Sequence, residues 1–426
     1  MDNLMDKIVS LAKRRGFIFP GSEIYGGLAN AWDYGPLGAE MKNNIKNRWW
    51  QTFVHERADM YGLDAALLMN TKVYEASGHL KEFSDPLVEC KACHERFRAD
   101  EVKAKTCPVC KKGELTEAKQ FNLMLKTFLG PVEAAENTVY FRPETAQGIF
   151  VNFKNVVDTM RPKLPFGIAQ IGKAFRNEIT PGNFIFRMRE FEQMEIEYFV
   201  READWQKYFE EWRQNMLAWI ADLGIKKEEI FEIDVAKDEL AHYSKRTIDF
   251  EYIFPFGQKE LFGLAYRTDF DLKNHGLDYT DDDGKKLIPH VIEPSLGVDR
   301  SLLAALCSAY TEEKLEKDER IVLKLPNWLA PVKVAVFPLM KNKPELVKKA
   351  QEIFASLQAN FVCQFDDNGN VGKRYRRQDE IGTPFCVTVD FDSLEKDTVT
   401  VRDRDSMKQT LVKIDELNAW LKNKLS

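Results

Sequence analysis

Arginines that stand close to acidic residues occur at three separate places along the chain. Arg176 and Arg187 belong to the first place, Arg267 to the second and Arg300 to the third. The sequence contains no glycine-rich phosphate loop of the GxxxxGK type. A bound phosphate would therefore be held by guanidinium groups, which grip oxygen atoms in pairs.

A second group of residues that could bind a ligand consists of four cysteines, Cys90, Cys93, Cys107 and Cys110. They form two C-x2-C pairs separated by 13 residues, whereas the other three of the seven cysteines are scattered in apolar contexts. Two such pairs can place four thiolates around one tetrahedral ion, which is typical of a structural zinc ribbon. The alternative is a site that has lost its metal. A catalytic zinc is not expected, because cysteine fills all four positions.

The residues from Phe175 to Phe199 predict an antiparallel hairpin that carries the first arginines. A Pro-Gly-Asn turn at 181–183 separates two alternating segments, of which the first is expected to include Arg176 and the second to begin at Arg187. One face of the second strand is largely apolar, and the other carries arginines, acids and one aromatic ring. This face could bind an ionic ligand, or it could be a solvated surface with salt bridges; the ring among the charges favours the first interpretation.

Two further segments can bring carboxylates to the same place. The residues from 290 onward begin as a strand with Glu293 and Ser295 on one face, and a helix after Gly297 then carries Arg300 in its first turn. The positive end of a helix suits an anionic ligand. Glu144 is expected at a strand-to-helix junction, and Arg267 and Asp269 are expected to share one face of a strand.

Length and composition indicate a soluble protein of two or three domains. The chain has 426 residues with a net charge of −6, and no apolar run approaches the roughly 20 residues of a membrane span. Its N-terminus lacks the apolar core of a signal peptide and is expected to form a helix that ends near Gly16. The expected location is therefore the cytoplasm.

Helical periodicity in the sequence predicts three longer helices. Residues 37–57 carry a broad apolar stripe with Trp49 and Trp50, which could be core packing or a subunit interface. Residues 203–222 and 343–358 are amphipathic. The cysteine-rich segment, 85–118, is expected to be a zinc-ribbon-like insertion, and the pattern after Pro326 indicates a small α/β domain.

The motifs together resemble those of a known family. FRNE…REF resembles motif 2 of the class II aminoacyl-tRNA synthetases, EPSLGVDR resembles motif 3, and the helix at 37–57 resembles motif 1. The words FRPETAQGIF, AYRTDFDL, EFEQMEIEYF and VIEPSLGVDR are similar to those of the homodimeric glycyl-tRNA synthetases. The class I signatures HIGH and KMSKS are absent. The resemblance covers nearly the whole chain.

The resemblance implies an α+β fold and two domains. Residues 1–328 would form a class II catalytic domain, an antiparallel sheet flanked by helices that includes the 85–118 insertion. Residues 329–426 would form an α/β anticodon-binding domain. It also implies a homodimer that takes ATP, Mg²⁺, glycine and glycine tRNA, with a structural Zn²⁺ on the four cysteines and no membrane partner.

The resemblance further implies roles for individual residues. Arg176 would hold the α-phosphate and is expected to be catalytic together with Arg300, which with Arg187 would hold the terminal phosphates. Phe191 would stack on the adenine, and Glu178 would accept a hydrogen bond from the amino group of the adenine. The implied ATP-binding residues are Arg176, Asn177, Glu178, Phe186, Arg187, Met188, Arg189, Glu190, Phe191, Glu260, Leu261, Gly297, Val298, Asp299 and Arg300. The implied glycine-binding residues are Arg98, Glu144, Phe191, Glu192, Gln193, Met194, Glu195, Arg267, Glu293, Pro294, Ser295, Leu296 and Gly297.

Three other functions were weighed against this interpretation. The protein could be a class II synthetase for another small amino acid, a non-catalytic RNA-binding relative on the same fold, or a nucleic-acid-binding zinc protein. The presence of Arg176, Arg187 and Arg300 argues against a non-catalytic relative. The acidic net charge argues against a nonspecific nucleic-acid coat.

The C-terminal segment contains one dense basic run, GKRYRRQDEIGTPF. Lys373, Arg374, Arg376 and Arg377 surround a tyrosine in a segment, 331–426, that otherwise has nearly balanced charge. Guanidinium groups beside a ring are typical of single-stranded RNA recognition. The run is therefore predicted to contact the tRNA, with a solvated basic loop as the alternative.

Overall fold

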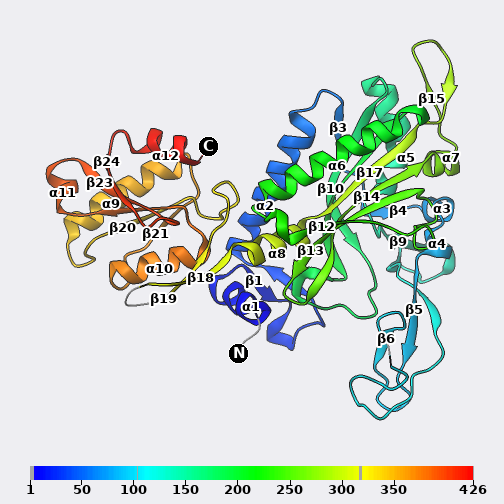
Figure 1. Ribbon diagram of the computed structural model, residues 1–426, viewed down its shortest axis with the longest axis horizontal. Helices are drawn as coiled ribbons and strands as arrows, with labels where there is room; N and C mark the ends of the chain where they lie inside the picture. Colours follow the sequence, from blue (N-terminus) through cyan, green and yellow to red (C-terminus); the bar gives the residue numbers. More distant parts are fainter. Residues whose placement is uncertain (1–3, 103, 316–318, 426) are drawn as a thin grey trace.

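The computed structural model describes residues 4–102, 104–315 and 319–425. Figure 1 shows a large body at the right, built on one extensive sheet, and a smaller body at the left that contains the C-terminus. The residues before Leu4 lie outside the described ones. Among the described residues, none of the helices combines the length and apolar character that crossing a membrane requires.

A seven-stranded sheet organises the large body. All neighbouring strands are antiparallel except β10 and β3, which are parallel. In sheet order the strands are β12 (Ile230–Asp234), β13 (Arg246–Phe254), β14 (Gly257–Thr268), β17 (His290–Gly297), β11 (Glu190–Val200), β10 (Phe166–Phe175) and β3 (Met60–Leu63). The expected antiparallel sheet flanked by helices is thus confirmed.

The predicted hairpin is formed by β10 and β11, but both strands are shorter at the turn than expected. β10 ends at Phe175 and β11 begins at Glu190, so Arg176 and Arg187 lie in the connection. The connection contains Asn183 and Phe184, whose positive φ angles of 55° and 59° prevent strand geometry. The arginines therefore stand on an irregular loop instead of on a flat sheet face.

Both faces of β11 are buried. Met194 and Ile196 are fully buried on the apolar face, while Glu195 and Glu197 on the opposite face are only 2% and 0% exposed. A solvated surface with salt bridges is therefore the wrong interpretation of this strand. Carboxylates are rarely buried to this extent unless a ligand or a partner group compensates them.

Helices cover the apolar face of the sheet. α2 (Pro36–Trp50) continues as a π-helical turn, Gln51–His55, and α6 (Trp205–Asp222) packs beside it. Trp49 is fully buried, and Phe53 lies 5.8 Å from the rings of both Trp212 and Trp219. The apolar stripe of the 37–57 segment is thus covered by this chain's own α8 (Val298–Ala309) and, at Phe53, by α6, which supports the core-packing interpretation.

The opposite face is covered by α5 (Ala146–Met160). Phe150 and Phe153 of this helix pack on Phe166 and Phe199 of the hairpin strands. α8 (Val298–Ala309) follows β17 directly, as predicted, and packs against α2 and β11. The first helix, α1 (Leu4–Arg15), ends where the sequence predicted.

Short elements complete the large body. They are β1 (Ile18–Pro20), β2 (Trp32–Tyr34), β4 (Leu68–Met69), α3 (Thr71–Ala76), α4 (His79–Glu82), β8 (Lys126–Phe128), β9 (Thr138–Phe141), α7 (Phe270–Asn274), β15 (Tyr279–Thr280), β16 (Lys286–Leu287), β18 (Tyr310–Lys314) and β19 (Glu319–Leu323). The cysteine-rich segment forms a separate small sheet of β5 (Ser84–Glu89), β6 (Arg96–Arg98) and β7 (Lys119–Asn122). It extends away from the main sheet at the lower right of Figure 1.

The smaller body is an α/β unit with a five-stranded sheet in the order β21, β20, β22, β23, β24. Its strands are β20 (Val334–Pro338), β21 (Cys363–Phe365), β22 (Phe385–Val389), β23 (Thr398–Asp403) and β24 (Gln409–Lys413), and its helices are α9 (Pro344–Gln358), α10 (Val371–Ile381), α11 (Phe391–Glu395) and α12 (Leu417–Leu425). The predicted α/β domain and the helix at 343–358 are both present.

The basic run proves to be helix α10 and not a loop. Arg374 is 1% exposed and donates hydrogen bonds to the carbonyl oxygens of Pro338, Asp367 and Gly369. Its guanidinium is thus used inside the domain, which argues against the predicted contact of Arg374 with tRNA. Side chains of Lys373, Arg376 and Arg377 remain at least partly exposed.

A buried ion pair, a hydrogen bond and a partly exposed ion pair join the two bodies. Arg320 of β19 contacts Asp379 of α10 at 3.2 Å, with both side chains at most 1% exposed. Arg404 donates to the carbonyl of Leu325 at 2.8 Å, and Arg14 of α1 contacts Glu380 at 3.1 Å. These contacts connect α10, the helix with the basic run, to the large body.

Candidate active site

Two adjoining cavities open over the strands at the centre of the sheet. The first cavity is lined by Arg176, Glu178, Ile185, Phe186, Arg187, Met188, Phe191, Glu192, Gln193, Glu260, Leu261, Ser295, Leu296, Gly297, Asp299 and Arg300. The second cavity is lined by Glu144, Arg176, Gln193, Glu195, Val235, Glu239, Leu240, Ala241, Tyr243, Thr247, Asp249, Glu260, Gly263, Ala265, Glu293 and Ser295. Four residues, Arg176, Gln193, Glu260 and Ser295, belong to both.

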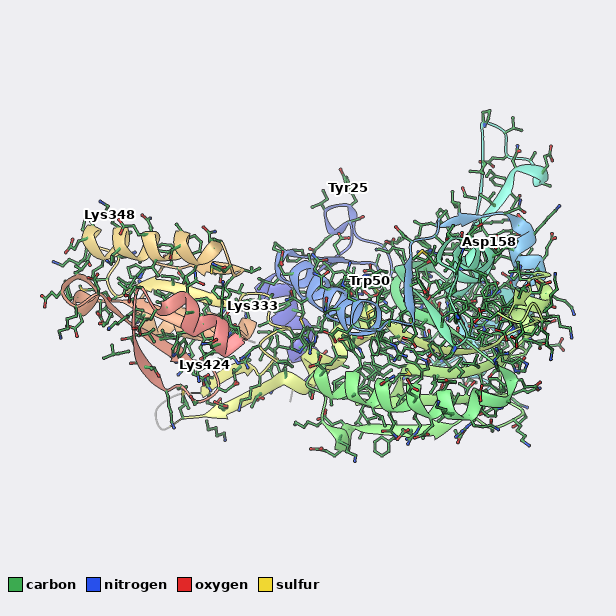
Figure 2. All side chains as sticks on the ribbon, turned by 90° about the horizontal axis from the view of Figure 1, so that it is seen from above. Tyr25, Trp50, Asp158, Lys333, Lys348 and Lys424 are labelled. Atoms are coloured by element: carbon green, nitrogen blue, oxygen red, sulfur yellow. The ribbon has the colours of Figure 1, made fainter. Side chains whose placement is uncertain are left out.

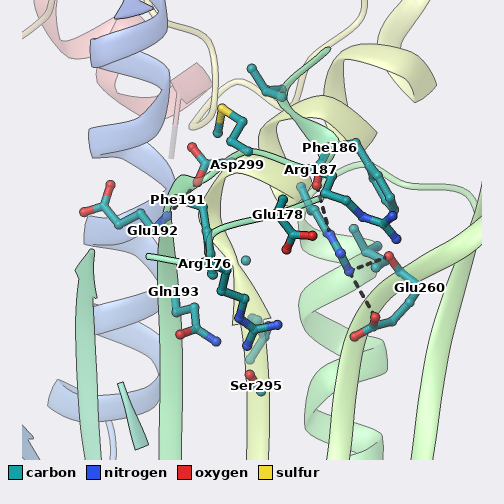
Figure 3. A pocket seen from close by; sticks show the side chains of 16 residues that line it. Arg176, Glu178, Phe186, Arg187, Phe191, Glu192, Gln193, Glu260, Ser295 and Asp299 are labelled. Atoms are coloured by element: carbon teal, nitrogen blue, oxygen red, sulfur yellow. Dashed lines mark hydrogen bonds and ion pairs between the residues drawn. The ribbon is translucent and has the colours of Figure 1, made fainter. Parts of the chain in front are cut away.

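Arg176 stands at the junction of the two cavities, and Figure 3 shows its guanidinium beside Gln193 and Ser295. Its Nε donates to the carbonyl of Pro143 at 3.0 Å, and its guanidinium lies 5.3 Å from the ring centroid of Phe191. One edge of the guanidinium is thus fixed by the backbone. The rest can grip oxygens of a ligand that extends across the junction.

Two other arginines of the first cavity are paired with acids. Arg187 contacts Glu101 of the cysteine-rich segment at 2.6 Å, and Arg300 contacts Glu260 at 3.2 Å. All four side chains are partly exposed, so these ion pairs are weak and can be exchanged for contacts to an anionic ligand. Arg300 also lies 4.4 Å from the ring centroid of Phe186, which limits the directions in which it can point.

Three buried carboxylates define the second cavity. Glu144 lies 3.3 Å from His79, Glu195 accepts a hydrogen bond from Ser295 at 2.8 Å, and Glu293 lies 2.7 Å from Arg267. Burial raises the pKa of Glu195, and the nearby charge of Glu144 raises it further. Burial opposes ionisation of Glu144 as well, but the His79 ring outweighs it and lowers the pKa of that carboxyl. Such a pocket favours a small cationic group.

Arg267 lies behind the second cavity and does not line it. It is 1% exposed and pairs with Asp271 at 2.8 Å in addition to Glu293. The prediction that Arg267 and Asp269 share a strand face is wrong, because β14 ends at Thr268, whose φ of 62° turns the chain. Arg267 therefore orients Glu293 and is not placed to touch a ligand.

Several other predicted glycine-binding residues lie elsewhere. Glu192 turns away from the second cavity toward α2 (Figure 3). There Lys42 and Lys46 hold its carboxylate at 3.0 and 3.1 Å. Arg98 pairs with Asp85 at 2.6 Å in the cysteine-rich segment and lines neither cavity. The remaining ones outside the second cavity are Phe191, Met194, Pro294, Leu296 and Gly297.

The predicted ATP-binding residues coincide largely with the first cavity. Those that line it are Arg176, Glu178, Phe186, Arg187, Met188, Phe191, Glu260, Leu261, Gly297, Asp299 and Arg300, whereas Asn177, Arg189, Glu190 and Val298 do not. Asp299 is 3% exposed and is bound by Lys42 at 3.0 Å, so it braces the cavity wall.

The segment at 235–247 closes one side of the second cavity and was not predicted. It contributes Tyr243, whose ring lies 3.7 Å from the Arg267 guanidinium, and it leads into Asp249 of β13. Burial, followed by the charges of Glu260 and Glu251, raises the pKa of Asp249 to about 7. The segment has no strand or helix periodicity, so nothing in the sequence indicated its position.

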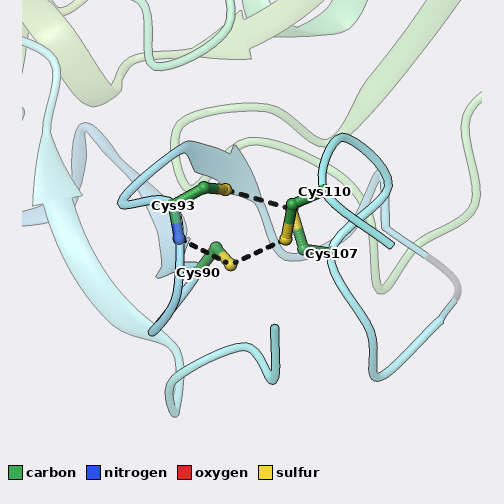
Figure 4. A group of neighbouring side chains, drawn as sticks. All are labelled: Cys90, Cys93, Cys107 and Cys110. Atoms are coloured by element: carbon green, nitrogen blue, oxygen red, sulfur yellow. Dashed lines mark hydrogen bonds between the residues drawn. The ribbon is translucent and has the colours of Figure 1, made fainter. Parts of the chain in front are cut away.

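The four cysteines of the C-x2-C pairs converge, as Figure 4 shows. The Sγ atoms of Cys90 and Cys110 are 3.7 Å apart, and those of Cys93 and Cys107 are 3.6 Å apart. Four sulfurs at ~2.3 Å from one tetrahedral zinc would be about 3.8 Å apart. A side chain at Gly113 would clash, because its Cβ would lie 2.3 Å from the Cys90 sulfur. The residues present therefore fit a closed structural zinc site.

Family models match both bodies of the chain. Residues 131–309 match the tRNA synthetase class II core domain (G, H, P, S and T), and residues 333–424 match the anticodon binding domain. The antiparallel sheet, the arginine-lined cavity and these two matches together define a class II aminoacyl-tRNA synthetase.

Similar proteins with known names indicate to which synthetase family the chain belongs. The glycine–tRNA ligase of Lachnospira eligens is 54% identical, with 100% of this chain and 99% of the relative aligned. The enzymes of the same name from Caldanaerobacter subterraneus subsp. tengcongensis and Bacillus thuringiensis subsp. konkukian are 53% and 51% identical, each over 99% of this chain and 98% and 99% of theirs. The chain belongs to the glycine–tRNA ligase family.

Proposed function

We propose that the protein attaches glycine to tRNA in two steps, through a glycyl-adenylate. The observation that supports it most is the pair of adjoining cavities with Arg176 at their junction. The first cavity, with its arginines and rings, suits ATP, and the second, with its three buried glutamates, suits the ammonium group of a small amino acid.

The first step requires little covalent help from the protein. The glycine carboxylate attacks the α-phosphate in line, the bond to the β-phosphate oxygen breaks, and pyrophosphate leaves. Arg176 at the junction is proposed to hold both reacting groups, while Arg187 and Arg300 leave their acidic partners to bind the leaving phosphates. Positioning and charge stabilisation of this kind account for most catalysis in phosphoryl and nucleotidyl transfer.

Glu260 and Asp249 are the side chains proposed to hold Mg²⁺. Both line the second cavity, Glu260 also lines the first, and carboxylate oxygens are the ligands this ion prefers. When bound, the ion would neutralise phosphate charge.

Selection for glycine is proposed to rest on exclusion. Glu144, Glu195 and Glu293 are proposed to attract the ammonium, and the 235–247 segment and Ala265, which line the same cavity, are proposed as the walls that a larger side chain would meet. A clash with a larger side chain can separate substrates more strongly than the ~1–3 kcal/mol that one methylene contributes in an apolar pocket.

The two-step function predicts tRNA charging. With ATP, Mg²⁺ and radiolabelled glycine, the protein should transfer label to the 3′ end of tRNA in an acid-precipitable and alkali-labile form. Label that stays acid-soluble although glycine is activated would limit the protein to the first step.

We propose residues 329–426 as the anticodon-binding domain and residues 1–328, with the 85–118 insertion, as the catalytic domain. Lys373, Arg376 and Arg377 of α10 are the proposed tRNA contacts. Replacing these three with alanine should lower tRNA affinity and flatten its dependence on salt, because fewer counterions are released on binding. Lys348→Ala on α9 is the matched control. Unchanged tRNA binding in the triple variant would remove α10 from the RNA surface.

We propose that the cysteine cluster holds one zinc ion per chain. Backbone N–H groups of Lys112 and Gly113 lower the pKa of Cys110 to about 6, which favours the thiolate that zinc binds. Metal analysis of protein prepared without added zinc should give about one zinc per chain, and Cys93→Ser should lower this ratio and the melting temperature. A wild-type ratio near zero with full activity would indicate a site that has lost its metal.

A cytoplasmic location is proposed on the basis of the translation function. A homodimer is proposed with the exposed apolar side chains of Ile24, Tyr25 and Leu28 as its surface, because they are 87%, 87% and 68% exposed and Tyr25 projects from the body in Figure 2. Light scattering decides between one and two chains per particle.

A further inference from the structure

Glu197 is a buried carboxyl group for which the proposed mechanism has no use. It lies on β11, two residues beyond Glu195, and it is 0% exposed. Neither of its oxygens has a hydrogen-bond partner. It lines neither of the two cavities described above. A buried carboxyl group without partners requires an explanation, because such groups are rarely tolerated in the ionised form.

Glu197 belongs to a cluster of three carboxyl groups directly beneath the second cavity. Oxygens of Glu195, Glu197 and Glu293 all lie within 4.8 Å of one another. The groups nearest to Glu197 in charge interaction are Glu293 of β17, Arg267 of β14, Glu195 of its own strand and Asp271 of α7. Arg267 is the sole cation among them.

The guanidinium of Arg267 already binds two other carboxylates. Arg267 binds Asp271 through Nε and Nη2 at 2.8 and 2.9 Å and reaches Glu293 through Nη1 at 2.7 Å. Glu195 is stabilised as an anion by hydrogen bonds from Thr145 and Ser295. Glu197 alone has neither a cation in contact nor a donor.

Like charges at this separation are unfavourable in a buried site, and one of the three groups is expected to retain a proton. Burial raises the pKa of all three carboxyl groups, but Glu293 is paired with Arg267 and Glu195 accepts hydrogen bonds, so Glu197, which has no partner, is the member left to carry the proton. Burial, followed by the charge of Glu293, raises the pKa of Glu197 well above its ordinary value, in agreement with the contacts.

We propose that the cluster of Glu195, Glu197 and Glu293 holds one proton on Glu197 in the glycine-free protein, and that the ammonium group of glycine displaces this proton to solvent on binding. The inference rests on the proposed function, since it takes the second cavity as the glycine site. The incoming positive charge contacts Glu195 and Glu293, which line the cavity, and so lies beside Glu197. It replaces the charge that the proton supplied. By losing its proton when the ammonium enters, Glu197 keeps the net charge of the pocket unchanged on glycine binding.

The release of a proton determines the direction in which the affinity for glycine changes with pH. A proton released on binding makes glycine bind more tightly as the pH rises through the range in which Glu197 holds its proton. With one proton released, the dissociation constant of glycine should fall about tenfold per pH unit in that range.

Calorimetric titration of the full-length protein with glycine tests this directly. The observed enthalpy is measured at pH 7 in three buffers of different ionisation enthalpy, and the slope gives the protons released. The wild type should release about one proton per glycine. Glu197→Gln should bind glycine and release almost none, because the amide has the shape of the acid without its proton. Glu232→Gln, in the same sheet but exposed, should behave as the wild type.

Two results would contradict the proposed proton release. A wild-type slope near zero with measurable glycine binding would overturn the inference, and so would equal slopes for the wild type and Glu197→Gln. Where the glutamine variant does not fold, Glu197→Met provides the same comparison without an amide that needs partners. An absence of any glycine binding would contradict the proposed function instead.

Discussion

Replacing Arg176 with alanine is expected to lower the rate of glycyl-adenylate formation by about two to three orders of magnitude. Arg176 is the one arginine that lines both cavities, so it alone can contact the carboxylate and the α-phosphate as charge moves between them. The measurement is pyrophosphate exchange at saturating ATP and glycine, which separates a loss of rate from a loss of binding.

Two variants serve as controls for this prediction. Arg176→Lys retains the charge without the planar fork, so its rate should lie between those of the alanine variant and the wild type. Arg201→Ala removes an exposed arginine that pairs only with Asp281 on the surface, and it should leave the rate unchanged. An alanine variant at Arg176 with wild-type exchange would remove this residue from the reacting centre.

Glu195→Gln is expected to raise the glycine KM by about tenfold to a hundredfold, the effect of losing a charge-assisted contact of ~1.5–3 kcal/mol. Its carboxylate lines the second cavity and is oriented by Ser295, so the lost charge faces the ammonium. The ATP KM should change little, because Glu195 does not line the first cavity.

The matched control is Glu210→Gln, which makes the same chemical change on the exposed side of α6. Its kinetics should equal those of the wild type. If Glu195→Gln showed a wild-type glycine KM, Glu195 would not face the ammonium, and the second cavity would need another ligand.

Local patterns predicted the elements that carry the site. The alternation along 187–199, the break at Gly297 and the C-x2-C spacing are all short-range signals, and a strand, a strand-to-helix junction and a cysteine cluster were found where these signals placed them. The strand ends were less accurate. β14 ends at Thr268, whose φ angle is positive, and the hydrophobic pattern does not predict such an angle in a residue other than glycine. β10 ends at Phe175, ahead of the predicted turn.

The roles of individual arginines could not be predicted from the sequence. Arg374 stands in a basic run, but its guanidinium donates to backbone carbonyls, one of which belongs to Pro338 at the end of strand β20. Arg267 stands in a motif of the family, yet it contacts Asp271 and Glu293 and leaves the cavity to others. Whether an arginine binds a ligand or a buried backbone depends on long-range contacts that only the fold defines.

The central claim is that the second cavity selects glycine for activation by ATP. ATP–pyrophosphate exchange measured with each of the twenty amino acids tests it most directly. We expect glycine to support exchange, and alanine and serine to give no more than the background without amino acid, because selection is proposed to rest on the exclusion of larger side chains. Exchange with alanine equal to that with glycine, or none with glycine, would contradict the account.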